Sequence, residues 1–110
     1  MSDKDRKLLI GILEFAQKVK RRTSLLSFND FLKDDDMQDA VLYALGQMGE
    51  KTNQLSDEFK EKYPKNEWYG LIGLRNRIFH SYKDISMDIV YNVSYENIDS
   101  LIELLEDLLN

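Results

Sequence analysis

Residues 36–62 read DMQDAVLYALGQMGEKTNQLSDEFKEK. Apolar side chains mark one face of this segment at Met37, Val41, Ala44, Leu45, Met48, Leu55 and Phe59. That spacing is typical of a long amphipathic helix, and Pro64 ends the segment because proline cannot continue a helix. The acids Asp34, Asp35 and Asp36 at its start are expected to cap free N–H groups. A metal site there is disfavoured, because successive helical residues point about 100° apart.

The rest of the chain is also helical in pattern. One helix is predicted over residues 3–22, and a helical turn is expected at 29–33. A third main helix begins at Asn66, interpreted as its N-cap, and the stretch 86–110 is helical with a kink or break at 92–97. Short connections and a single proline predict an all-α, up-and-down bundle of four to five helices. We place all 110 residues in one domain.

Composition excludes several classes of protein. The chain is 43% hydrophobic, enough for a core, and it has no cysteine for disulfides, thiolate metal sites or a cysteine nucleophile. The N-terminus carries no signal-peptide pattern, and no apolar run has the length to span a bilayer. We therefore expect a soluble, cytoplasmic protein with no membrane association.

The charge balance limits how the chain meets nucleic acid. The net charge of −5 repels nucleic acid at long range, so any RNA contact must come from a local basic patch. This disfavours a general nucleic-acid coat protein. The basic cluster Lys18–Arg22 is interpreted first as cations at the negative end of the first helix, with an RNA-facing patch as the alternative.

Two glycines in the third helix need an explanation. Gly70 and Gly73 lie three apart, near one helix face, and each costs about 1 kcal/mol relative to alanine. Close approach of another helix, from the same chain or a second subunit, is the usual compensation.

The chemistry-bearing segment is GLRNRIFHSY, residues 73–82, which holds the only histidine of the chain. Asn76 and His80 are four apart and share a helix face. Arg75 lies about 140° around the helix from His80, but its long side chain can bend toward it. Arginine binds phosphate with paired N–H donors, and histidine transfers protons near neutral pH. A purely structural role of this single histidine is the simplest alternative.

This segment resembles the HEPN superfamily, and in particular its HepT-like toxins. Those proteins carry an Arg, four to six residues and a His, matched here by Arg75 and His80, with a polar residue after the arginine, matched by Asn76. The HepT branch extends the motif to His-x-Tyr, matched at Tyr82. The resemblance also includes Glu50 in the second helix, Pro64, Trp68, Gly73 and the leucine-rich last helix, and it covers about residues 36 to 108.

The resemblance implies cleavage of RNA without a metal or other cofactor. The RNA 2′-hydroxyl would attack the adjacent phosphate. His80 would act as general base or acid, Arg75 would neutralise charge on the phosphate, and Asn76 would orient the phosphate or His80. Base and acid are both needed, and one chain has one histidine, so a homodimer with a composite site is predicted.

Flanking residues have expected roles as well. The resemblance implies a MntA-like nucleotidyltransferase antitoxin that inhibits the toxin by transferring AMP to Tyr82. Arg77 and Lys83 are interpreted as RNA-phosphate contacts, with solvated charges as the alternative. Glu50 either pairs with an arginine or is an ordinary surface residue.

Two further classes of function remain open from the sequence. One is a non-catalytic HEPN binding or scaffold subunit that partners a nucleotidyltransferase. The other is a plain interaction bundle in which the motif is structural. The intact set of Arg75, Asn76, His80 and Tyr82 favours the ribonuclease.

Overall fold

The computed structural model describes residues 1–110 and contains helices but no strands, which confirms the all-α prediction. The elements are α1 (Asp3–Thr23), α2 (Phe28–Phe31), α3 (Asp35–Gln54), α4 (Asp57–Lys62), α5 (Asn66–Ser81), the 3₁₀ turn η1 (Tyr82–Asp84), α6 (Met87–Tyr91), the π turn η2 (Asn92–Glu96) and α7 (Ile98–Leu109).

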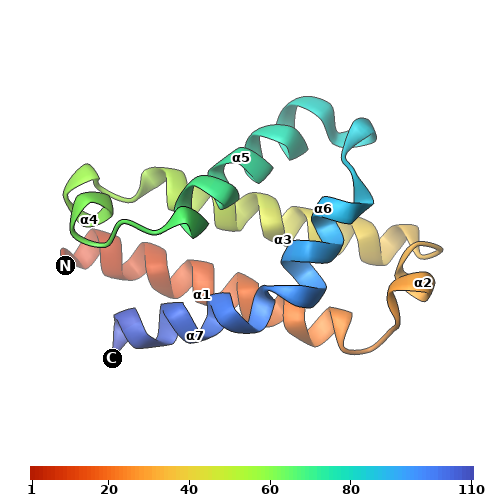
Figure 1. Ribbon diagram of the computed structural model, residues 1–110, viewed down its shortest axis with the longest axis horizontal. Coiled ribbons are helices and arrows are strands. Elements are labelled where there is room, and N and C mark those ends of the chain that lie inside the picture. Colours follow the sequence, from red (N-terminus) through yellow and green to blue (C-terminus); the bar gives the residue numbers. More distant parts are fainter.

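The long helices run up and down, as Figure 1 shows. Helix α1 packs against both α3 and α7, and α3 also packs against α5. Helix α5 leans over α3, while the chain returns through α6 and η2 to α7 beside α1 (Figure 1). The result is that α5 has one main helical neighbour and an outer side that this chain leaves open.

Buried apolar side chains join the long helices into one core. Helix α1 contributes Leu9 and Ile12, which are fully buried, and α3 contributes Leu45 and Met48. Trp68 at the start of α5 is also fully buried, and its indole N–H donates to the Tyr63 carbonyl at 2.8 Å. This bond fixes the connection from which α5 starts.

Helix caps agree with the sequence in one case and differ in another. Asp34 is the N-cap of α3, and its carboxylate accepts a 3.0 Å hydrogen bond from the Met37 N–H, so the capping interpretation is confirmed. The prediction of Asn66 as an N-cap is wrong. Lys65 holds that position without a side-chain cap bond, and Asn66 is the first helical residue. Lys65 has the extended backbone that is usual for an N-cap residue, so the helix starts one residue earlier than the polar pattern indicates.

The single helix predicted over residues 36–62 is also wrong, because it is divided into α3 and α4. Leu55 leaves helical geometry, and the Ser56 side chain caps α4 by accepting from the Phe59 N–H at 3.1 Å. The buried carboxylate of Asp5 in α1 accepts from both the backbone N–H of Ser56, at 2.9 Å, and its hydroxyl, at 2.6 Å. A contact across the fold thus stabilises the break, while Leu55 and Phe59 both stay buried.

The predicted interruption at residues 92–97 is confirmed. The π turn η2 spans Asn92–Glu96 between α6 and α7. Buried Ser94 donates to the Val90 carbonyl, and the Ser94 carbonyl accepts from the Thr23 hydroxyl at 3.2 Å. The bend is therefore joined to the end of α1.

The basic cluster lies where a helix dipole favours cations. Lys20, Arg21 and Arg22 occupy the last turn of α1, and Lys20 forms an exposed ion pair with Asp99 of α7. These positions agree with the dipole interpretation. Separately, none of the helices combines the length and the apolar character that crossing a bilayer requires.

Candidate functional site

The site is built on a close crossing of α3 and α5. A Cβ on Gly49 would lie 2.4 Å from the Cβ of Arg75 and 2.4 Å from the Leu71 carbonyl oxygen. One turn away, a Cβ on Gly46 would lie 3.3 Å from the Phe79 ring. Only glycine at position 49 admits the α5 backbone this closely. This pair was not predicted from the sequence, although two glycines three apart within one helix are a visible signal of close packing.

Gly70 and Gly73 do not make the contact expected of them within the chain. A Cβ at either position would meet no atom within 4 Å. The possibility that a helix of the same chain covers them is therefore wrong, because α3 lies against the other side of α5. Coverage by a second subunit stays a prediction.

Arg75 is held in place by three neighbours. Its Nε donates to Glu50 Oε2 at 2.7 Å, and one terminal nitrogen donates to Asn76 Oδ1 at 2.8 Å. The guanidinium also lies over the Phe79 ring, 5.0 Å from its centroid. A guanidinium has five N–H donors, so three remain available to a ligand. The Arg75 side chain is thus fixed in orientation and still has donors for a ligand.

Glu50 is the residue that orients Arg75. Hydrogen bonds from Arg75, and then from Gln54 at 3.2 Å, lower the pKa of Glu50 below its ordinary value. The side chains of Glu50 and Arg75 are 30% and 25% exposed, so the pair lies at the edge of the core. Of the two interpretations of Glu50, the structure supports pairing with an arginine.

His80 lies in the last turn of α5 and is exposed. Neither ring nitrogen has a hydrogen-bond partner in the chain, so both can meet a ligand. Asn76, one turn earlier on the helix, is exposed as well and bonds to Arg75 rather than to His80. The structure thus joins Arg75, Asn76 and Glu50 by contacts, whereas His80 makes no contact with them and lies exposed in the last turn of the same helix. The roles of these residues in catalysis stay predictions.

Tyr82 follows α5 in the turn η1 and contacts α3. Its hydroxyl donates to Asp39 Oδ1. This hydrogen bond, together with partial burial and the charge of Asp39, raises the pKa of Tyr82 to about 12. Asp39 was not among the residues predicted from the sequence, since no local spacing connects residues 39 and 82.

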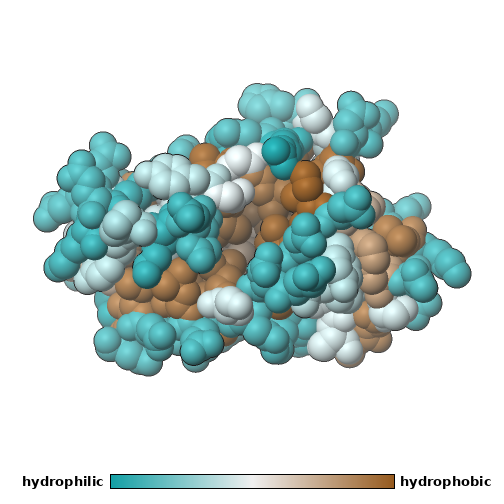
Figure 2. Space-filling model, viewed as in Figure 1, coloured by the Kyte–Doolittle hydropathy of each residue, from teal (hydrophilic) through white to brown (hydrophobic).

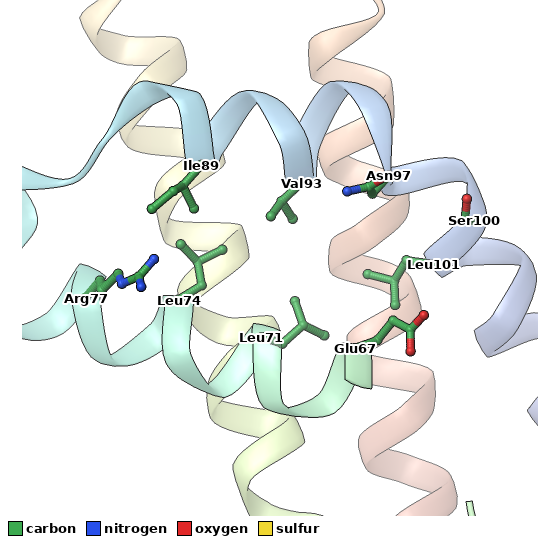
Figure 3. A pocket seen from close by; sticks show the side chains of 10 residues that line it. Glu67, Leu71, Leu74, Arg77, Ile89, Val93, Asn97, Ser100 and Leu101 are labelled. Carbon is green, nitrogen blue, oxygen red and sulfur yellow. The ribbon is translucent and has the colours of Figure 1, made fainter. Parts of the chain in front are cut away.

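Arg77 and Lys83 lie apart from the Arg75 contacts. Arg77 borders a hollow of about 560 Å³ between α5 and the segment α6–η2–α7, which also contains Leu71, Leu74 and Leu101. Figure 3 shows Arg77 and the leucines of α5 facing Ile89 and Val93 across this space. Lys83 borders a different depression, together with Tyr82. Their contact with RNA phosphate stays a prediction. No group of three or more His, Asp or Glu side chains is placed to hold a metal ion.

Comparison with known proteins identifies the family. The family model described as Ribonuclease HepT-like matches residues 12–108. A protein of Methanocaldococcus jannaschii named "Putative RNase MJ0127" is 32% identical over 110 residues, covering 99% of this chain and 91% of its own. The "Probable ribonuclease HepT" of Thermococcus cleftensis is 29% identical over 93 residues, 84% of each chain. No solved structure matches. With nearly its whole length covered, this chain belongs to the HepT-like ribonuclease family.

Proposed function

We propose that this protein is a metal-independent RNA endonuclease, the toxin of a toxin–antitoxin pair that acts on RNA in the cytoplasm. One observation carries the proposal: Glu50 and Asn76 hold the Arg75 guanidinium with three N–H donors free, and the exposed His80 lies in the last turn of the same helix. Membership in the HepT-like ribonuclease family supports RNA as the substrate class.

The proposed reaction is internal transfer at a phosphodiester. The 2′-oxygen bonds to phosphorus while the bond from phosphorus to the 5′-oxygen breaks, which leaves a 2′,3′-cyclic phosphate and a 5′-hydroxyl. A histidine accepts the 2′ proton, and a second group donates a proton to the leaving 5′-oxygen. Arg75 neutralises negative charge that grows on the phosphate oxygens.

The two proton transfers support a homodimer with a composite site. Each chain has one histidine, so a second subunit is the simplest source of the partner. The outer side of α5 offers a contact surface that includes exposed Tyr69, the uncovered Gly73 and exposed His80. Gly70, which is also uncovered, lines the hollow between α5 and α6–η2–α7. A Gly70→Leu protein that stayed dimeric and fully active would exclude this surface as the contact.

Incubation of unmodified protein with RNA tests the activity. Wild type should produce cyclic phosphate ends even with a chelator present, while His80→Ala and Arg75→Ala should each lose roughly 10²- to 10⁴-fold in rate. Because His80 is exposed and makes no hydrogen bond, thermal melting of His80→Ala should match wild type. A well-folded wild-type dimer that never cleaves RNA would favour the binding module instead.

We further propose that a MntA-like nucleotidyltransferase antitoxin inhibits the toxin by adenylylating Tyr82. This tyrosine is 43% exposed and lies two residues beyond His80. An AMP group there would place negative charge and bulk where an RNA phosphate must approach. Mass spectrometry after incubation with ATP and such a partner should find the AMP on Tyr82, and an unmodified Tyr82 would contradict this regulation.

A further inference from the structure

Tyr82 differs from every other tyrosine of the chain in what its hydroxyl contacts. Six tyrosines are present, and two of their hydroxyls donate hydrogen bonds within the protein. Tyr95 donates to a backbone carbonyl at 3.3 Å, whereas Tyr82 donates to the carboxylate of Asp39. A phenol paired with a carboxylate has a proton acceptor already in contact with its oxygen.

This pair is open to a reagent from outside. Tyr82 and Asp39 border a depression of about 390 Å³ between α3 and η1. The other titratable side chains around it are Asp35 and Lys83. Arg75 and Glu50 are not part of this lining, so the pair is separate from the contacts that hold the arginine.

The chemistry of phenols makes that acceptor relevant. A neutral phenol is a weak nucleophile and needs an adjacent base or a lowered pKa to attack phosphorus. The pKa of Tyr82 is raised to about 12 by the hydrogen bond to Asp39, by partial burial and by the Asp39 charge, so its phenolate is scarce at neutral pH. Attack by Tyr82 therefore requires a base that removes the proton while the new bond forms.

We propose that Asp39 is the general base for nucleotidyl transfer to Tyr82, an inference that rests on the modification proposed above. The Tyr82 oxygen attacks the α-phosphorus of a nucleoside triphosphate held by the transferase. The oxygen–phosphorus bond forms as the bond to the β-phosphate breaks, and pyrophosphate leaves with the electron pair. The hydroxyl proton passes to the Asp39 carboxylate, which later releases it to water.

A first experiment needs no partner protein. The purified wild-type chain is treated with an aryl sulfonyl fluoride, in which a phenol oxygen replaces fluoride on sulfur, and labelling is measured at each tyrosine by mass spectrometry. Tyr82 should react faster than Tyr43 and Tyr69, although these are more exposed, at 62% and 66%. Asp39→Asn, which keeps an acceptor oxygen but loses the basicity, should slow Tyr82 by roughly 10²-fold and leave Tyr69 unchanged.

Asp35→Asn is the matched control, because it removes the same charge from the same depression without touching the Tyr82 hydroxyl. Its Tyr82 should react at nearly the wild-type rate. Equal slowing by both variants, or a wild-type Tyr82 no more reactive than Tyr69, would overturn the base assignment in favour of a general charge effect or none.

A second experiment uses the nucleotidyltransferase and ATP, and follows AMP incorporation at several pH values. The rate of AMP incorporation into wild type should be nearly independent of pH between about 6 and 9. The rate for Asp39→Asn should be lower and should rise about tenfold per pH unit, because hydroxide replaces the missing base. If wild type and Asp39→Asn were modified at equal rates with the same pH profile, Asp39 would not be the base, but adenylylation of Tyr82 would still hold. No AMP on wild-type Tyr82 would overturn the modification and this inference together, without bearing on RNA cleavage.

Discussion

At the scale of single residues, Glu50 decides what Arg75 can do. An unrestrained arginine side chain samples many rotamers, and ordering it costs up to about 2 kcal/mol of conformational entropy. Glu50 takes the Nε–H, Asn76 takes one terminal N–H, and the Phe79 ring lies against the guanidinium. Most of that cost is therefore met before RNA binds, which makes Glu50 a positioning residue for the proposed reaction.

Replacement of Glu50 tests this positioning. Glu50→Ala should lower kcat for RNA cleavage by about 10- to 100-fold with a smaller change in KM, because Arg75 loses its fixed geometry. Glu50→Gln should recover much of the loss, since its amide oxygen can still accept from Arg75 Nε. Steady-state kinetics of the two variants measure the difference. If Glu50→Ala cleaved RNA with wild-type kcat, the arginine would not need its partner.

The contribution of Asp5 to the stability of the fold depends on pH. Burial raises the pKa of its carboxyl, but hydrogen bonds from the Ser56 side chain and backbone outweigh burial, and the net pKa is lowered from 3.8. A lowered folded-state pKa stabilises the protein above the unfolded value, about 3.9, and this stability is lost as the pH falls through the folded value.

Urea unfolding of Asp5→Asn should reveal that contribution. At pH 7 the variant should be less stable than wild type by about 1 to 3 kcal/mol, because a charged acceptor of two hydrogen bonds is lost. The difference should shrink as the pH is lowered below about 4, where wild-type Asp5 takes up a proton. A difference that stays constant down to pH 2 would show that Asp5 is not the titrating group.

At the scale of elements, the two glycine pairs separate two sides of α5. Gly46 and Gly49 of α3 admit α5 on its inner side, and Gly70 and Gly73 lie on α5 with nothing within 4 Å. Packing in this chain requires glycine at position 49, whereas a Cβ at position 46 would be a tight contact with the Phe79 side chain. The outer pair lowers helix stability, and no contact within the chain offsets that loss, which is why we propose that a second subunit packs there.

Alanine at one glycine of each pair should have opposite effects on the monomer. Gly49→Ala should destabilise it by about 1 to 3 kcal/mol, since the new methyl meets the Leu71 carbonyl and the Arg75 Cβ, both at 2.4 Å. Gly73→Ala should stabilise it by roughly 0.5 to 1 kcal/mol, because alanine favours the helix and meets nothing. Urea unfolding at low protein concentration measures both, and effects of the same sign would contradict the assignment of sides.

At the scale of the whole molecule, α5 packs on a single long helix and keeps many exposed residues. It packs on α3, and between it and α6–η2–α7 an apolar hollow remains. Figure 2 shows hydrophobic side chains gathered in this hollow, with polar residues along both rims. The molecule measures 41 × 28 × 19 Å, and the last turns of α5, with exposed Asn76 and His80, lie at its surface.

If the active unit is a homodimer, cleavage depends on protein concentration in a way that a monomeric enzyme does not. Below the dissociation constant of the dimer, the initial rate should rise with about the square of chain concentration, and above it linearly. A dilution series with a fixed RNA substrate measures this, and sedimentation of the same samples provides the control. A linear rate across concentrations at which the protein sediments as a monomer would show that one chain suffices.

The sequence by itself determined what local pattern controls: the all-α class, the acidic cap at the start of α3, the interruption before α7, and the helix that carries Arg75 and His80. Helical periodicity and capping depend on neighbours three or four residues away, so they can be read along the chain. The N-cap of α5 is Lys65 and not the predicted Asn66, because neighbouring positions for a helix end differ little in free energy.

Only the tertiary structure decided which distant residues meet. Asp5 reaches Ser56 and divides a helix whose periodicity continues through the break, Glu50 receives Arg75, and Asp39 accepts from Tyr82. It also assigned close packing to Gly46 and Gly49 rather than to Gly70 and Gly73. The physical reason is that periodicity shows that a face is buried but not which helix covers it, since that depends on the packing of all helices together.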